Sequence, residues 1–141
     1  MQYIEIAKGS VANRGIIIPK TDLIKHVNDK EELFRSYFSF DEEIKLHIAS
    51  GKKTPLTFGG KFYLDYLIFD IDKGDNSTNF TILRLKEFVK KLEDDWRLNN
   101  SHFTVWFSGR GFHIHTCDFF GFEPSNKLPL EVKNTIDEHF P

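Results

Sequence analysis

The chain has 141 residues, of which 40% are hydrophobic and 28% are charged, with 15 phenylalanines and a formal net charge of −2. This composition predicts one folded domain with an aromatic core, and it does not fit a tight duplex binder, which needs clustered basic surface. The single cysteine, Cys117, excludes disulfides within the chain and cysteine-built zinc sites, and no apolar run is long enough to span a membrane.

Two strands and two helices are predicted in the first third of the chain. Residues 3–7 (YIEIA) alternate along a strand, and residues 14–19 (RGIIIP) form a second apolar run that Pro19 ends. Helices are expected over 29–40 and 41–50, because apolar residues recur in both at helical spacing. The expected caps are Asp29 and Asp41, and the expected stop of the second helix is Gly51.

Residues 57–72 (TFGGKFYLDYLIFDID) are predicted to form a hairpin, or a bulged strand, that turns at Gly59 and Gly60. The second arm is apolar on both faces at residues 67–69, which predicts a central, covered strand. Lys52 and Lys53 are expected in a solvated loop. No repeat or Pro/Ser-rich linker is visible, so we place no boundary and expect one domain over 1–141.

A long helix is predicted over residues 79–99, followed by strands over 102–107 and 112–117 that the SGRG turn at 108–111 joins. A final amphipathic helix is expected over 130–140. The fold class is therefore α+β, with a strand–helix–strand–strand core from about residue 60 onward. The long helix is expected to bury Phe80, Leu83, Phe88, Leu92 and Trp96 along one side.

Two aspartates, Asp70 and Asp72, lie one residue apart at the end of the apolar run LIFDID. Alternate residues of a strand point to the same face, so the two carboxylates are expected side by side. Such a pair repels unless a cation lies between its members, and carboxylate oxygens are the ligands that hard divalent ions prefer. An isolated Asp pair of this kind more often ends a strand or caps a turn than binds metal.

The stretch VWFSGRGFHIH supplies a candidate anion site. Ser108, Gly109 and Arg110 offer a hydroxyl, a backbone N–H and a guanidinium, and His113 follows on the next strand. Nucleotidyl transfer requires carboxylate-bound metal next to a site that binds a triphosphate, and these two motifs would supply both. His115 shares the face of His113 and is a secondary candidate, for which a structural role fits equally well. Trp106 is expected on the strand face opposite Phe107, as core or as stacking surface.

LIFDID (67–72) and FSGRGFHIH (107–115) resemble two motifs of the archaeo-eukaryotic primase superfamily, an hhhDhD motif and an s-x-H motif in the extended S-G-x-G-x-H form. The resemblance, to catalytic small subunits and viral primase-polymerases, covers about residues 33–141. It includes FRSYFSFDEEIKLHI before the first motif and FGFEPS after the second. It implies an RRM-like, antiparallel-rich sheet packed with helices, preceded by an N-terminal α/β extension.

The resemblance implies that Asp70 and Asp72 hold catalytic Mg²⁺ or Mn²⁺. Ser108, Arg110 and His113, with Gly109 beside them, are then expected to hold the triphosphate of the incoming nucleotide. The implied protein is a DNA primase or primase-polymerase that takes a single-stranded DNA template and nucleoside triphosphates, with a helicase or other replication proteins as partners. The first ten residues lack the features of a signal peptide, so we expect a cytoplasmic, non-secreted protein of cellular or viral origin.

Family members carry a third acidic residue in a later hD motif. TID, which ends at Asp137, matches in letters but lies in a helical pattern close to the C-terminus. We therefore expect the third ligand beyond Pro141, with Asp137 as the secondary candidate, and the catalytic domain to be truncated at its C-terminus. Residues 1–141 alone are then expected to fold and bind metal or nucleotide weakly, but to synthesise little or no product.

The sequence leaves two other functional classes open. An RRM-like nucleic-acid-binding or accessory subunit needs no catalysis. A haloacid-dehalogenase-type phosphatase also carries hhhDxD, with Asp70 as nucleophile, but it expects Thr or Val where this chain has Gly74. Its parallel sheet also conflicts with the hairpin predicted over 103–117.

Overall fold

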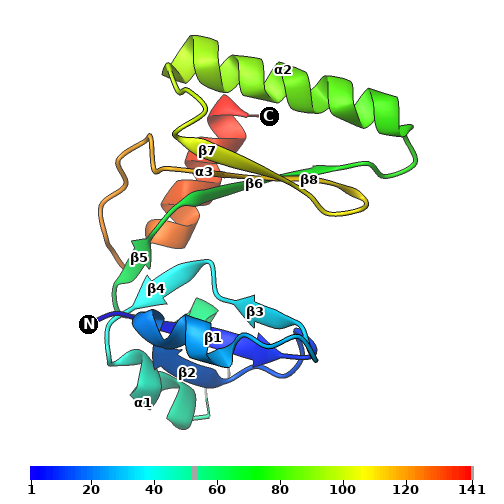
Figure 1. Ribbon diagram of the computed structural model, residues 1–141. Helices are drawn as coiled ribbons and strands as arrows, with labels where there is room; N and C mark the ends of the chain where they lie inside the picture. Colours follow the sequence, from blue (N-terminus) through cyan, green and yellow to red (C-terminus); the bar gives the residue numbers. More distant parts are fainter. Residues whose placement is uncertain (52–53, 141) are drawn as a thin grey trace. The chain divides into compact units, whose positions relative to one another are not determined.

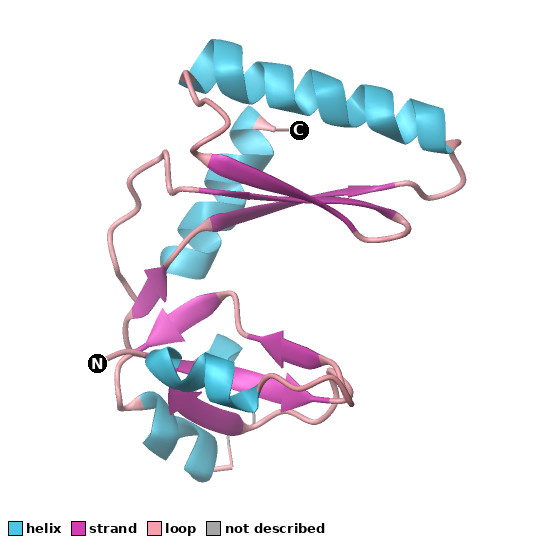
Figure 2. Ribbon diagram, in the orientation of Figure 1, coloured by secondary structure: helices cyan, strands magenta, loops and turns pink. Residues whose placement is uncertain are grey.

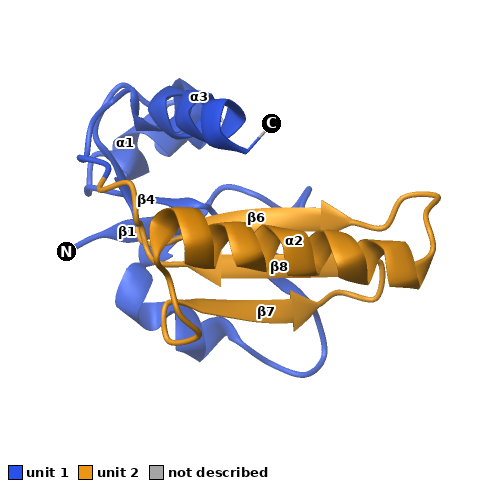
Figure 3. Cartoon of the chain, turned by 90° about the horizontal axis from the view of Figure 1, so that it is seen from above, with its two compact units in different colours: residues 1–64, 122–141 blue, residues 65–121 orange. Residues whose placement is uncertain are grey.

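The computed structural model describes residues 1–51 and 54–140 (Figure 1). They form two compact units, one of residues 1–64 and 122–141 and the other of residues 65–121 (Figure 3). The first unit contains an antiparallel sheet and several helices, and the second an antiparallel sheet and the helix α2 (Figure 2), which confirms the α+β class. The single domain stays a prediction, and Lys52 and Lys53 lie outside the described residues. None of the described helices has the length and apolar character of a membrane span.

The first unit is built on a five-stranded antiparallel sheet in which the first strand is central. Both predicted N-terminal strands are present, and β1 pairs with β2 on one side and with β3 and β4 on the other. Ile4 and Ile6 are buried on one face of β1, and Glu5 is buried on the other, where Arg14 and the backbone N–H of Gly15 donate to its carboxylate. The strands are β1 (Tyr3–Lys8), β2 (Ile16–Pro19), β3 (Leu33–Arg35), β4 (Phe38–Phe40) and β5 (Phe62–Leu64).

The helix predicted over 29–40 is wrong, because this segment forms β3 and β4. The Asn28 side chain accepts from the backbone N–H groups of Lys30 and Glu31, which makes a turn where the helix was expected to begin. The segment then pairs with β1 and β5, and the rings of Phe38 and Phe40 pack edge-on against Phe62. Pairing with distant strands overrides the local helical spacing.

The second predicted helix exists as α1 (Ile44–Ala49), but Asp41 does not cap it. The Asp41 carboxylate instead accepts from the Tyr63 hydroxyl at 3.0 and 3.1 Å, which raises the pKa of Tyr63 because the bond stabilises the protonated phenol. Gly51 follows the helix with φ +88°, which confirms the expected stop. The first unit also contains η1 (Lys20–His26), η2 (Pro55–Thr57) and α3 (Leu128–His139), the predicted final helix.

The hairpin expected at Gly59 and Gly60 is wrong, and so is its alternative of one bulged strand. η2 precedes the two glycines, and β5 pairs with β4. The second predicted arm, β6, belongs to the sheet of the other unit. A Cβ at Gly60 would collide with the ring of Phe58, so this glycine serves a close contact rather than a hairpin turn.

The second unit has the predicted strand–helix–strand–strand order: β6 (Leu67–Asp72), α2 (Thr78–Trp96), β7 (Phe103–Phe107) and β8 (Gly111–Thr116). Its sheet is antiparallel with the order β6-β8-β7, and α2 lies along one face (Figures 1 and 3). Within the described residues β6 is therefore an edge strand, not the central strand predicted. Leu67, Phe69 and Ile71 are buried on the α2 side, whereas the opposite side of β6 carries both aspartates.

The helix α2 is present, but the apolar side predicted for it is partly wrong. Phe80 and Leu83 are 47% and 57% exposed, while Thr81 is buried and its hydroxyl donates to the Ser77 carbonyl oxygen. Phe88 packs on Phe69 of the sheet with ring centroids 4.9 Å apart. The side that is buried or half-buried comprises Thr81, Leu85, Phe88, Leu92 and Trp96.

Candidate functional site

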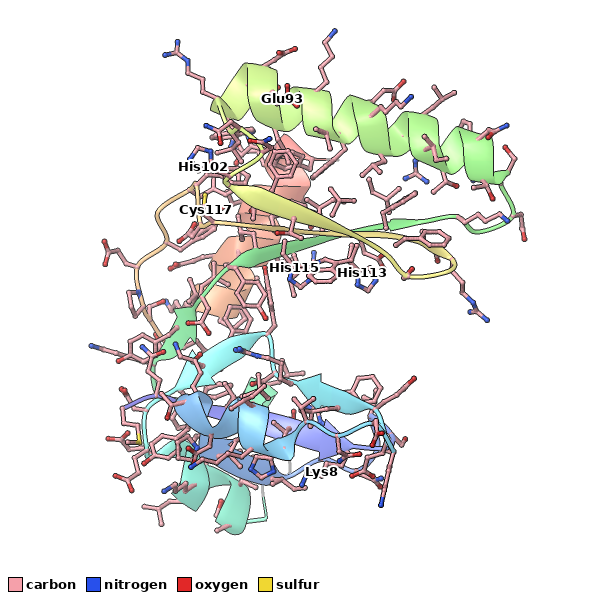
Figure 4. The ribbon with its side chains drawn as sticks, in the orientation of Figure 1. Lys8, Glu93, His102, His113, His115 and Cys117 are labelled. Atoms are coloured by element: carbon pink, nitrogen blue, oxygen red, sulfur yellow. The ribbon has the colours of Figure 1, made fainter. Side chains whose placement is uncertain are left out.

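The two faces of the β6-β8-β7 sheet differ in chemistry. Residues paired across an antiparallel ladder share a face, so the register assigns each side chain. One face, which includes Phe69 and Ile114, is covered by α2. We call the other the open face, and His113 and His115 project from it on the side opposite α2 (Figure 4). Its side chains are Ile68, Asp70, Asp72, Thr104, Trp106, His113 and His115.

Three rows cross the open face at right angles to the strands. The middle row places Asp70, His113 and Trp106 next to one another on three strands. The row nearest the β7–β8 turn holds Asp72 opposite Gly111, and the third holds Ile68, His115 and Thr104. The register therefore brings both predicted motifs together on one surface.

Asp70 and Asp72 are both exposed on the open face, so the shared face expected for them is confirmed. Asp70 Oδ1 lies 3.4 Å from His113 Nε2. Asp72 Oδ1 accepts from the backbone N–H of Gly74 at 3.3 Å. Two hard-oxygen donors fit Mg²⁺ or Mn²⁺ with waters completing the octahedron. Across residues 1–51 and 54–140, no group of three or more acidic, histidine or cysteine side chains converges in a metal-binding arrangement.

The predicted SGRG turn is present and is held closely against β6. The Ser108 backbone N–H and hydroxyl both donate to the Gly111 carbonyl oxygen, at 2.9 and 3.1 Å. Gly109 has φ +89°, where an L side chain is strained. The backbone N–H of Lys73 donates to the Arg110 carbonyl oxygen at 2.8 Å, which ties the turn to the end of β6. In this arrangement the Ser108 proton is directed into the turn rather than to a ligand.

A Cβ at Gly111 would collide with the Ile71 carbonyl oxygen, whereas one at Gly109 meets nothing within 4 Å. We expect Gly111→Ala to destabilise the fold by at least the ~1–3 kcal/mol typical of overpacking, because rigid backbone rather than a side chain must move. Gly109→Ala is the matched control. Its free energy of unfolding should fall by only about 1–2 kcal/mol, the cost of placing a side chain on a residue with positive φ. Urea unfolding followed by circular dichroism measures both, and equal losses would contradict the close approach.

An open hollow of about 400 Å³ lies where β6 ends beside this turn. Two cationic side chains, Lys73 and Arg110, line it together with Asp72 and Asp75. Among the described residues, neither cationic side chain has an ion-pair partner, so both are available to an anion. Gly74 and Gly109 complete the lining, both at positive φ. Lys73 and Asp75 were not among the predicted site residues; the one available signal was their place directly after the Asp pair.

His115 is half-buried on the open face and stacks on Tyr66, with ring centroids 5.3 Å apart and planes 13° from parallel. Burial, and then the neighbouring His113, lower the pKa of His115, because both disfavour its protonated form. The structure thus supports the packing role that the sequence left open for it. Asp137, the other secondary candidate, lies on α3 as expected and pairs with Lys133 Nζ at 2.7 Å.

The lowered pKa of His115 predicts a pH dependence of stability. The unfolded chain takes up this proton near the usual pKa of about 6.5, before the folded chain does. The free energy of unfolding should therefore be fully maintained above that pH and fall as the pH drops from there through the pKa of the folded state. NMR titration of the ring protons should give His115 a pKa below 6.5. His113→Gln should raise that pKa only in part, since burial is the larger cause; an unshifted His115 would contradict this.

No protein-family model, curated protein or solved structure matches this chain. The open face and the hollow beside it are the features of this chain that indicate a function. The carboxylates of Asp70 and Asp72 can bind a divalent cation. His113 lies in the row of Asp70, and Lys73 and Arg110 lie beside Asp72 in the hollow. Such a surface is suited to a ligand that combines metal-bound phosphates with an organic group.

Proposed function

We propose that this chain is a nucleotidyltransferase of the DNA primase or primase-polymerase type. The observation that carries the proposal is the register of β6 with β8, which places Asp70 beside His113 and Asp72 beside the 108–111 turn. Two motifs that lie almost forty residues apart in the sequence thus form one surface. An enzyme that joins nucleoside triphosphates on a single-stranded DNA template needs these groups together.

In this proposal Asp70 and Asp72 would hold Mg²⁺ or Mn²⁺, and the bound ion would stabilise the negative charge that develops during the reaction. Arg110 and Lys73 neutralise the negative charge of the triphosphate in the hollow. His113, in the middle row of the open face, donates a hydrogen bond to it. These contacts orient the α-phosphorus toward a 3′-hydroxyl. The 3′-hydroxyl gives up its proton to water as its oxygen forms the new bond to phosphorus; the bond to the β-phosphate breaks, and pyrophosphate leaves.

The fold of the second unit supports this proposal. A strand–helix–strand–strand unit with the strand order β6-β8-β7 and one covered face is what an RRM-like core contains. The antiparallel sheet disfavours the phosphatase alternative, which requires parallel strands. The third acidic ligand implied by the primase resemblance stays a prediction, since the Asp137 carboxylate is paired with Lys133.

Incorporation of labelled nucleotide on a single-stranded DNA template, with Mg²⁺ or Mn²⁺ and with chelator, tests the proposal. We expect this chain to bind Mn²⁺ and nucleoside triphosphate, and its incorporation, which should be weak, to require both template and metal. A binding module would retain the single strand without metal and incorporate nothing. A phosphatase would release phosphate from a small phosphomonoester without template. Either result would replace the proposal.

A further inference from the structure

Trp106 is the large aromatic side chain of the open face, and the packing of the fold does not account for it. It is 57% exposed, and among the described residues its one ring contact is with His115, at 6.4 Å between centroids. Trp96, by contrast, packs against Phe119 and Phe120. An exposed indole of this kind, on a face that carries two carboxylates and two imidazoles, is suited to stacking with a planar ligand.

The position of Trp106 relative to the hollow selects the ligand. Trp106 stands in the middle row, next to His113, and the row of Asp72 and Gly111 lies between it and Arg110. Successive rows on one face of a sheet are about 7 Å apart. This spacing suits an elongated ligand whose anionic groups lie more than one row away from its aromatic group, as the outer phosphates and the base do in a nucleoside triphosphate.

The charges along the open face follow the same order. Lys73 and Arg110 lie at the turn end, where phosphates need cations; Asp72 lies in the row next to the turn, and Asp70 lies in the middle row on β6, with β8 between it and Trp106 on β7. The side chains that flank Trp106 directly are His113 in its own row and Thr104 and His115 in the next row, and none of them is acidic or permanently charged. Charge complementarity therefore gives the ligand a direction, with its phosphates toward the turn and its uncharged ring toward Trp106.

We propose that Trp106 stacks on the base of the nucleoside triphosphate whose phosphates lie against Lys73 and Arg110. The identity of this ligand rests on the proposed function, whereas the stacking itself does not require catalysis. Stacking is tolerant of base identity because every base has a π-face. The site should therefore accept all four bases, with purines bound more tightly because they offer more overlap.

Trp106→Leu tests the inference by calorimetry with ATP and, separately, with tripolyphosphate, which has no base. We expect ATP affinity to fall about five- to 150-fold while tripolyphosphate affinity is unchanged. Trp106→Phe should retain most of the ATP affinity, because a ring remains. ATP should also quench tryptophan fluorescence in the parent protein more than in Trp106→Phe, a comparison that holds even if the leucine variant fails to fold.

Phe107→Leu is the matched control, because Phe107 is a 67% exposed aromatic on the opposite face of the same strand. Its ATP affinity should equal that of the parent. Equal losses for ATP and tripolyphosphate in Trp106→Leu, or equal ATP losses in both variants, would overturn the inference. A loss confined to a dT oligonucleotide, absent for its abasic counterpart and for ATP, would also overturn it and assign Trp106 to the template. Base-dependent ATP binding without any binding of Mn²⁺ would support the inference and refute the proposed function alone.

Discussion

Replacing Asp70 or Asp72 with asparagine is expected to reduce metal-dependent nucleotide incorporation at least about a hundredfold, because each substitution removes one anionic ligand at unchanged size. Binding of Mn²⁺, followed by electron paramagnetic resonance, should weaken in parallel. The two variants should behave alike, since both carboxylates lie on the open face of one strand.

Stability should be preserved in both variants. Asp70 and His113 are largely exposed, so their 3.4 Å contact contributes at most about 1 kcal/mol. Loss of the repulsion between the two carboxylates acts in the opposite direction and offsets it. Urea unfolding should therefore give midpoints close to that of the parent.

Asp137→Asn is the matched control for these variants, because Asp137 is a carboxylate already paired with a lysine on α3. We expect it to bind Mn²⁺ as the parent does. Unchanged Mn²⁺ binding in Asp70→Asn and Asp72→Asn would remove the basis for the metal site. Incorporation lost in Asp137→Asn alone would make Asp137 the third ligand and contradict its role as a helix-surface residue.

The core of the second unit could be predicted from local patterns. Phe112 and Ile114 alternate with His113 and His115, and the structure buries Ile114 while it leaves His113 exposed. The SGRG sequence suits the turn that joins β7 and β8. These features depend on residues close in sequence, whose spacing alone assigns their faces.

Local patterns failed where distant pairing decided the structure. Leu33, Phe34, Tyr37 and Phe38 fit a helical face, but their segment supplies strands to the sheet of β1 and β5. On α2, hydrophobicity favoured Phe80, whereas Thr81 is buried because its hydroxyl is satisfied by the Ser77 carbonyl oxygen. Whether such a polar residue is buried depends on a hydrogen-bond partner, and the residue type alone does not indicate that partner.

The candidate site was predictable in its motifs but not in its extent. Both aspartates and the turn could be identified from residue type and spacing, whereas the contact of Asp70 with His113 depends on strand register. The hollow depends on the Lys73 N–H donating to the Arg110 carbonyl oxygen, across 37 positions of sequence. No local signal specifies that bond, which is why Lys73 and Asp75 were not predicted as site residues.

The candidate triphosphate site is tested by removing the guanidinium of Arg110 and the imidazole of His113. Arg110→Ala and His113→Ala should each weaken nucleoside triphosphate binding about 10- to 150-fold, the range of ~1.5–3 kcal/mol per hydrogen bond to a charged group. Binding of a single-stranded oligonucleotide should change far less, since the hollow has room for a compact triphosphate beside the turn. Ser108→Ala should act mainly on the turn, because its hydroxyl donates to the Gly111 carbonyl oxygen.

Lys86→Ala controls for the loss of one positive charge, because Lys86 is exposed on α2, and α2 packs on the opposite face of the sheet. Its triphosphate affinity should match that of the parent at moderate ionic strength, where distant exposed charges are screened. If Arg110→Ala and His113→Ala weaken oligonucleotide and triphosphate equally, the turn contacts template instead. If neither ligand is affected, residues 108–111 are an ordinary hairpin turn, and the open face has to bind its ligand without them.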